Sequence, residues 1–195
     1  YMAYRLLILW LLALFGSSEA SAQTWTVCAG GGCNYTTISG AVNNANTLDG
    51  HTIEIETGTY AESFTVNKAL EFVSVDGPGT AIISGTGTNM INVGGSKLVS
   101  FTDFTIGDAG GASQRCFYVQ AGATLTLDNV TVRNCNRNAN GGGMGMASGG
   151  AANIVDSTFT GNDVRGGADR RGPHIDVQGV VNISGSLFEL GIGEQ

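Results

Sequence analysis

The 195 residues suit one domain or one stack of repeats, and an apolar share of 42% is enough for a core. The 31 glycines have no three-residue period, which excludes collagen, and the apolar share excludes simple disorder. The net charge of -7 argues against nucleic acids and anionic membranes as partners. Abundant Gly, Thr, Ser, Asn and Val favour short strands joined by tight turns over long helices.

The first 22 residues have the pattern of a secretory signal peptide. Arg5 supplies a small positive region, the apolar run Leu6–Phe15 follows, and Ala20-Ser21-Ala22 forms an A-x-A cleavage signal. The run of about ten residues is shorter than the roughly 20 that span a bilayer. We therefore expect a mature chain of residues 23–195 without an integral membrane segment, located outside the cell, in the periplasm or on the cell surface.

A short helix is predicted near the start of the mature chain. Ile38, Ala41, Val42 and Ala45 follow the i, i+3, i+4, i+7 spacing of one helical stripe within residues 37–46, and Thr37 suits the N-cap. A stack of repeats exposes its core at both ends, so this helix is expected to cover the N-terminal end. The residues after Leu187 show no equivalent capping pattern.

An internal repeat occupies most of the remaining chain. Apolar strands with Asp, Asn or Gly at the third position begin at Phe101, Leu127, Ile154 and Ile183, with spacings of 26, 27 and 29 residues (101 to 127, 127 to 154, 154 to 183). A less clear copy begins at Phe72. Each unit is too short to bury its own apolar side chains, so stacking is expected to place these residues in one interior column. The prediction for the second column is Ile106, Val132, Phe159 and Phe188, and for the bends it is Asp103, Asn129, Asp156 and Gly185.

Shorter strand candidates lie between these strands, at 90–93, 117–119, 144–146 and 175–177, so each unit has at least two strand faces. The sequence therefore predicts an all-β fold, a single-stranded right-handed parallel β-helix with a short N-terminal capping helix. An antiparallel sandwich is the main alternative. The absence of an Asn-Gly or Asp-Gly hairpin series and the long period argue against the sandwich.

Four cysteines in an exported chain suggest two disulfides. The glycine-rich segment between Cys28 and Cys33 could bend into one bridge, and Cys116 with Cys135 would make the second. Metal binding is the alternative, but the spacing and the absence of a nearby His disfavour it. Three pairings of four cysteines are possible, and the sequence does not choose among them.

The segments 35–45, 52–62 and 70–85 resemble the opening of pectin-lyase-like right-handed β-helix proteins, which include pectin esterases. In that superfamily a short helix is followed by a strand and a G-T-Y-x-E turn, here Gly58–Glu62. The later half resembles repeats of polymorphic outer-membrane and other bacterial surface β-helix proteins, through Phe159–Asn162 and Gly166-Gly-Ala168. Asp169 departs from the usual apolar residue that follows the second motif.

The superfamily resemblance implies sites that this chain carries only in part. A polysaccharide lyase would need carboxylates for calcium and a basic Arg or Lys, for which Asp103, Asp128, Asp156 and Arg133 are candidates. Turn and solvent-facing roles explain the same residues, and Lys68 and Lys97 stand outside any motif. A pectin esterase would need paired Asp with Gln and Arg. Gln114-Arg115-Cys116 resembles those motifs only weakly.

The densest polar cluster is Arg170-Arg171-Gly-Pro-His174-Ile-Asp176. His174 and Asp176 would alternate on a strand and face the same side, as an acid and a base in a lyase or epimerase would. A polar outer corner of the solenoid is the interpretation we favour. His51 stands alone in a predicted turn, where a structural role is expected.

No residue is therefore assigned a catalytic, cofactor-binding or metal-binding role. The sequence predicts an exported or cell-surface β-helix module, non-enzymatic, for adhesion or binding of polysaccharide or cell-surface glycans. The alternative is a fragment of a pectin-lyase-like carbohydrate-active enzyme, that is, a polysaccharide lyase, epimerase or esterase. Further coils or self-association at the uncapped C-terminal end are also expected possibilities.

Overall fold

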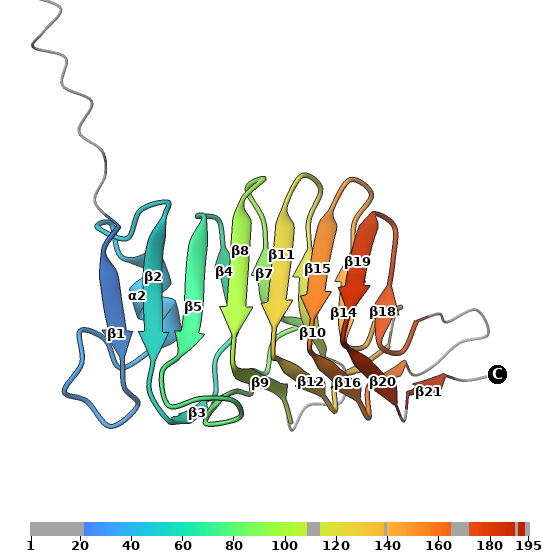
Figure 1. The fold of residues 1–195 in the computed structure, drawn as a ribbon, viewed down its shortest axis with the longest axis horizontal. Helices are drawn as coiled ribbons and strands as arrows, with labels where there is room; N and C mark the ends of the chain where they lie inside the picture. The colour runs from blue at the N-terminus through green and yellow to red at the C-terminus, as the bar shows by residue number, and fades with distance from the viewer. Residues whose placement is uncertain (1–21, 109–113, 139, 165–171, 190, 194–195) are drawn as a thin grey trace, which may run out of the picture.

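The computed structural model describes residues 22–108, 114–138, 140–164, 172–189 and 191–193. These residues form a β-solenoid of about six turns in which almost every strand pairs in parallel with the turns before and after it (Figure 1). The predicted all-β parallel solenoid is confirmed. The predicted signal peptide lies outside the described residues, apart from Ala22.

The described strands form three long sheets and one short one. Sheet A consists of β1 (Thr24–Val27), β2 (His51–Ile55), β5 (Leu70–Ser74), β8 (Leu98–Thr102), β11 (Thr124–Asp128), β15 (Ala151–Val155) and β19 (Val180–Ser184). Sheet B consists of β3 (Gly58–Tyr60), β6 (Ala81–Ile83), β9 (Phe104–Gly107), β12 (Thr131–Arg133), β16 (Thr158–Thr160) and β20 (Leu187–Glu189). Sheet C consists of β4 (Phe64–Val66), β7 (Asn89–Val93), β10 (Arg115–Val119), β14 (Met144–Met146) and β18 (Ile175–Asp176). The short sheet D consists of β13 (Asn136–Arg137), β17 (Asp163–Val164) and β21 (Ile192–Gly193).

The strand register confirms both predicted columns, and their members are buried in every turn before the last, where Ile183 is exposed and Phe188 partly buried. In sheet A, the first column has one residue in each turn, and each residue pairs with the next: Phe72, Phe101, Leu127, Ile154 and Ile183. In sheet B, the second column pairs Ile106 through to Phe188. The rings of Phe72 and Phe101 stack with centroids 4.4 Å apart. Burying each such side chain stabilises the fold by roughly 1.5–3 kcal/mol.

The predicted bends lie between sheets A and B, and all four residues have positive φ. The angles are 67° at Asp103, 53° at Asn129, 46° at Asp156 and 60° at Gly185. Asp, Asn and Gly are the residues that tolerate this conformation best, which explains the third position of the repeat. The Asn129 side chain also donates to Asp103 Oδ1 over 2.6 Å, so neighbouring bends are linked across turns.

The predicted cap is α2 (Ile38–Asn43), with Thr37 as N-cap through a 3.2 Å bond from Gly40 N to its Oγ1. Ile38, Ala41 and Val42 are buried against the N-terminal end of the core. The helix is shorter than predicted, and Ala45 lies beyond it and is exposed. Lys68 accounts for the early end of the helix, because its Nζ binds carbonyls that a longer helix would use itself. It donates to Val42 O over 2.7 Å and to Asn44 O over 2.9 Å.

The two suggested disulfides are both present, and the structure selects one of the three possible pairings. Cys28 pairs with Cys33, and Cys116 pairs with Cys135. The second bridge is fully buried and ties β10 of sheet C to the segment that follows β12. Two disulfides are consistent with an extracellular location.

Candidate functional site

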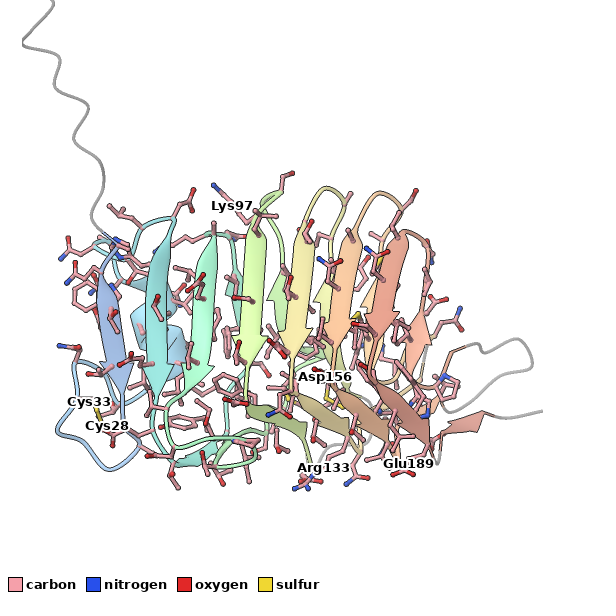
Figure 2. All side chains as sticks on the ribbon, viewed as in Figure 1. Cys28, Cys33, Lys97, Arg133, Asp156 and Glu189 are labelled. Carbon is pink, nitrogen blue, oxygen red and sulfur yellow. A yellow bond between two sulfur atoms is a disulfide. The ribbon has the colours of Figure 1, made fainter. Side chains whose placement is uncertain are left out.

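The structure does not gather the acidic residues that a calcium-dependent lyase would need. Asp103 and Asp156 lie on the same row of bends but are separated by the turn that carries Asn129, at a spacing of roughly 5 Å per turn. Arg133 extends from the outer edge of the solenoid (Figure 2) and its Nε donates to Asp108 Oδ2 over 2.6 Å. Among the described residues, no group of aspartates and glutamates converges in a geometry suited to a metal ion.

The expectation that His174 and Asp176 face the same side is wrong. His174 precedes β18, and its ring packs edge-on against Phe159 and Phe188 at 6.5 and 5.9 Å, on the interior side. Asp176 lies within β18 and faces an outer cleft. The alternation rule holds only inside a strand, and β18 begins at Ile175. The two arginines at 170–171 and the repeat motif at 166–168 lie outside the described residues.

His51 has the structural role that was expected, although it begins strand β2 rather than sitting in a turn. Its Nδ1 accepts from Trp25 Nε1 and from Leu48 N, both over 3.3 Å. Two donors on one ring nitrogen place the imidazole proton on Nε2. The ring therefore ties β1, β2 and the preceding loop together.

The candidate site richest in polar side chains is a cleft of 380 Å³ on the outer face of sheet C, hereafter the sheet C cleft. Its lining residues come from four successive turns and are predominantly polar: Asn89, Arg115, Tyr118, Arg137, Asn140, Gly145, Met146, Asp176 and Gln178. Its volume lies in the range of small-ligand sites.

One row of sheet C builds the floor of this cleft. Tyr118 pairs with Gly145 on the next turn, and Gly145 pairs with Asp176 on the turn after that. Because Gly145 has no side chain, the row has a gap between the Tyr118 ring and the Asp176 carboxylate. The Arg115 side chain fills this gap, since a Cβ on Gly145 would lie 2.4 Å from Arg115 Cζ.

Arg115 is held rigidly in this slot. Its Nε donates to Gly141 O over 2.8 Å, its Nη2 donates to Asn140 O, and its Nη1 lies 3.5 Å from Asn89 Oδ1. Its Cζ lies 5.1 Å from the centroid of the Tyr118 ring, within cation–π range. The residue is only 8% exposed.

The acceptors around this buried cation are neutral. They are two backbone carbonyls and one amide oxygen, and Arg115 forms no ion pair with any residue that the structure describes. Burial lowers the pKa of Arg115, and the neighbouring charge of Arg137 lowers it further, whereas Tyr118 and Asp176 act in the opposite direction. A guanidinium has five N–H donors, so this one retains donors for a ligand.

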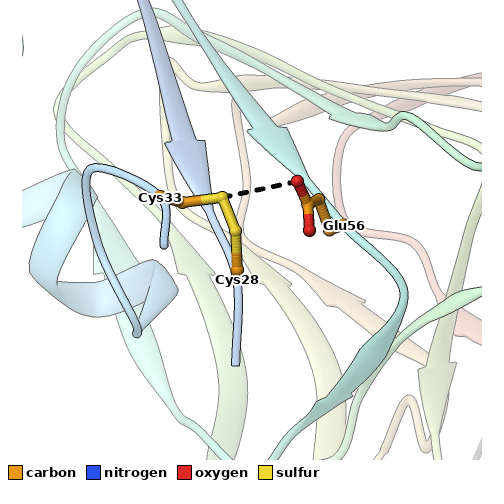
Figure 3. A group of neighbouring side chains, drawn as sticks. All are labelled: Cys28, Cys33 and Glu56. Atoms are coloured by element: carbon orange, nitrogen blue, oxygen red, sulfur yellow. Dashed lines mark hydrogen bonds between the residues drawn. A yellow bond between two sulfur atoms is a disulfide. The ribbon is translucent and has the colours of Figure 1, made fainter. Parts of the chain in front are cut away.

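The only metal-ligand cluster in the described chain is Cys28, Cys33 and Glu56 (Figure 3). Glu56 Oε1 lies 3.5 Å from Cys33 Sγ. Both sulfurs belong to the disulfide, so neither is the thiolate that a metal would require. This cluster is therefore a structural bridge with a carboxylate beside it.

Sequence reasoning passed over the sheet C cleft. Arg115 stood out in the sequence only beside Gln114 and Cys116, as a faint likeness to an esterase motif. The available signal was Gly145 inside a predicted strand, since glycine in a strand often marks close approach of another group. The partner could not be identified without the register that places Arg115 one turn away.

No protein-family model, curated protein or solved structure matches this chain. Within the described residues, no helix has the length and apolar character needed to cross a membrane.

Proposed function

We propose that this chain is an exported or cell-surface β-solenoid that binds carbohydrate for adhesion, and that the sheet C cleft is its binding site. The observation that carries the proposal is the preorganised Arg115 guanidinium, held between Tyr118 and Asp176 on an outer face. The two disulfides support a location outside the reducing cytoplasm.

The chemistry of the cleft suits a sugar. Hydroxyl groups need both donors and acceptors, and the cleft supplies guanidinium donors, a carboxylate and the amides of Asn89 and Gln178. Arg115 and Arg137 also favour an acidic group on one sugar, because a guanidinium binds a carboxylate through two parallel hydrogen bonds. The net charge of -7 opposes a ligand with many negative charges. We therefore expect a glycan with few acidic groups.

The test is binding of the purified mature chain to a panel of neutral and acidic oligosaccharides, measured by a glycan array and then by calorimetry. Wild-type protein is expected to bind at least one glycan. Arg115→Gln should weaken that binding by roughly a hundredfold, which corresponds to ~2.7 kcal/mol.

Arg133→Gln is the matched control, because it removes the same charge from the outer face of sheet B. It should leave glycan binding unchanged. If Arg115→Gln fails to fold, as judged by its melting curve, Tyr118→Ser tests the same cleft from the half-buried ring. Binding that is absent from the wild-type panel, or lost equally in the Arg133 variant, would contradict the proposal.

A second candidate is a polysaccharide lyase reaction in the same cleft. It is favoured by the coexistence there of an arginine with a lowered pKa, a phenol and a carboxylate. Incubation with polygalacturonate or alginate, with and without calcium, should then yield an unsaturated product that absorbs in the ultraviolet. The carbohydrate-binding proposal predicts no such product.

A further inference from the structure

The two backbone carbonyls that hold Arg115 in the sheet C cleft belong to consecutive residues, Asn140 and Gly141. Nη2 of Arg115 donates to Asn140 O, and its Nε donates to Gly141 O over 2.8 Å. These two residues are the single Asn-Gly dipeptide in the sequence. Asn140 is half-buried and lines the cleft, so it is in contact with solvent.

Asparagine is a labile residue, and it deamidates most readily when glycine follows it, because a residue without a Cβ lets its nitrogen approach the asparagine side chain. The Gly141 nitrogen loses its proton and bonds to Asn140 Cγ, and the side-chain amide leaves as ammonia. Water then opens the cyclic imide on one side or the other, which gives aspartate or isoaspartate. One water is consumed for each ammonia released, so the reaction needs no oxidant, reductant or cofactor.

The fold requires the glycine of this dipeptide. Gly141 has a φ of 71°, and a Cβ added to it would lie 2.3 Å from Met144 O. The next residue is confined in the same way, since a Cβ on Gly142 would lie 2.4 Å from Asp163 O. A larger residue at position 141 would therefore strain the backbone and clash with the neighbouring strand. The labile dipeptide is a consequence of how this turn packs.

Either product places a negative charge beside a cation that has no ion pair among the described residues. In isoaspartate, the new carboxylate is built on the main-chain carbonyl of residue 140, the group that accepts from Arg115 Nη2. In aspartate, the carboxylate is on the side chain of the same residue. A carboxylate can bind a guanidinium through two parallel hydrogen bonds. It would therefore occupy the donors that Arg115 otherwise offers to a ligand.

We propose that Asn140-Gly141 is a spontaneous deamidation site, and that its product closes the sheet C cleft to acidic glycans by pairing with Arg115. The closure rests on the proposed function of the cleft, whereas the modification and the ion pair do not. Because the ammonia is lost, hydrolysis does not restore the amide. The capacity of the protein to bind such glycans therefore falls as the protein ages.

The first experiment is incubation of the purified mature chain in warm, mildly alkaline buffer, which favours loss of the Gly141 proton, followed by peptide mass spectrometry. The peptide that contains Asn140 should gain the mass difference between a hydroxyl and an amino group faster than peptides with other asparagines. Asn140→Gln is the matched control, because it keeps an amide but would need a larger, slower-forming ring. Wild-type protein that deamidates no faster at Asn140 than elsewhere overturns the proposal.

The second experiment tests the ion pair without any glycan, because Asn140→Asp reproduces the aspartate product. Its melting temperature at neutral pH should exceed that of wild type by about 2–4 °C. The gain should be lost as the pH falls below about 4, where a carboxylate takes up its proton. Asn153→Asp adds the same charge to the outer face of sheet A and should show no such gain. Equal melting temperatures for Asn140→Asp and wild type at neutral pH overturn the proposal.

The third experiment measures closure of the cleft on a panel of acidic oligosaccharides. Asn140→Asp and the aged fraction with one added negative charge should bind at least tenfold more weakly than fresh wild-type protein. Asn153→Asp should bind like wild type, and undiminished binding by Asn140→Asp overturns the proposal. Fresh wild-type protein that binds no oligosaccharide contradicts the proposed function and with it the closure, while the first two experiments still decide the modification and the ion pair.

Discussion

Single residues define the sheet C cleft, and Gly145 contributes to it through its lack of a side chain. The Arg115 guanidinium occupies the space where a side chain at this position would stand. Gly145→Ala should therefore expel the guanidinium from its slot and reduce glycan affinity at least tenfold, ~1.4 kcal/mol. Calorimetry against the bound glycan checks the loss.

The control for this change is Gly149→Ala, a turn glycine of the following loop that has no atom closer than 4.0 Å to an added Cβ. Its φ of 83° makes alanine unfavourable there, so it should lower stability without changing glycan affinity. If both variants bind like wild type, Arg115 does not depend on the gap at Gly145.

The bends between sheets A and B allow backbone and side-chain contributions to be separated at Asn129. Alanine tolerates a φ of 53° less well than asparagine, and it cannot donate the hydrogen bond to Asp103. Asn129→Ala should therefore lower the free energy of unfolding by about 2 kcal/mol. Asn129→Gly keeps the conformation accessible and removes only the bond, so we expect about 1 kcal/mol. Urea unfolding measures both, and equal losses would mean that the positive φ carries no cost here.

At the scale of elements, α2 depends on one carboxylate from a distant turn. Glu62 accepts from Ile38 N over 2.8 Å and from Ser39 N over 2.9 Å, at the helix end where backbone donors lack internal partners. Glu62→Gln should therefore lower the free energy of unfolding by about 1–2 kcal/mol. Glu71→Gln, an exposed residue of β5, should change it by less than about 0.5 kcal/mol. Similar melting curves for the two variants would contradict this role.

The helices and strands also show which parts of the fold could be predicted from the sequence. The columns through Phe101 and Ile106 were predictable because a repeat of similar length forces equivalent residues into one stack. The end of α2 was not predictable, because Lys68, in the connection between β4 and β5, donates to its C-cap carbonyl from 24 residues further along the chain. Whether the His174 side chain points inward or outward depends on where β18 begins. A strand of two residues is too short to show the alternation of apolar and polar residues that would locate it. The sheet C cleft needed the register between turns, which no local pattern contains.

For the whole molecule, stability is distributed as a row of turns in which each turn contacts only its neighbours. Within the described chain, the last turn has a neighbour on one side only, so we expect it to open before the interior turns. His174 makes this end sensitive to acid. Burial beside Phe159 and Phe188 lowers the pKa of His174 below its ordinary value of 6.5.

The direction of the pH effect follows from that shift. Above the unfolded pKa the imidazole is neutral in both states, and the stability contribution is fully present. As the pH falls through about 6.5, the unfolded chain binds the proton first, so the free energy of unfolding decreases until the pH passes the lower folded pKa. Hydrogen exchange of the β19 and β20 amides should therefore accelerate between pH 7 and pH 5, after correction for the intrinsic rate.

His174→Gln should remove that acceleration, because glutamine keeps a polar group near Asn162 but does not titrate in this range. The comparison is made between the wild-type chain and His174→Gln at the same protein concentration. If exchange accelerates equally in the two proteins as the pH falls, another group governs the end of the solenoid. If only the protein that retains the histidine responds, one half-buried ring couples the stability of the last described turn to pH.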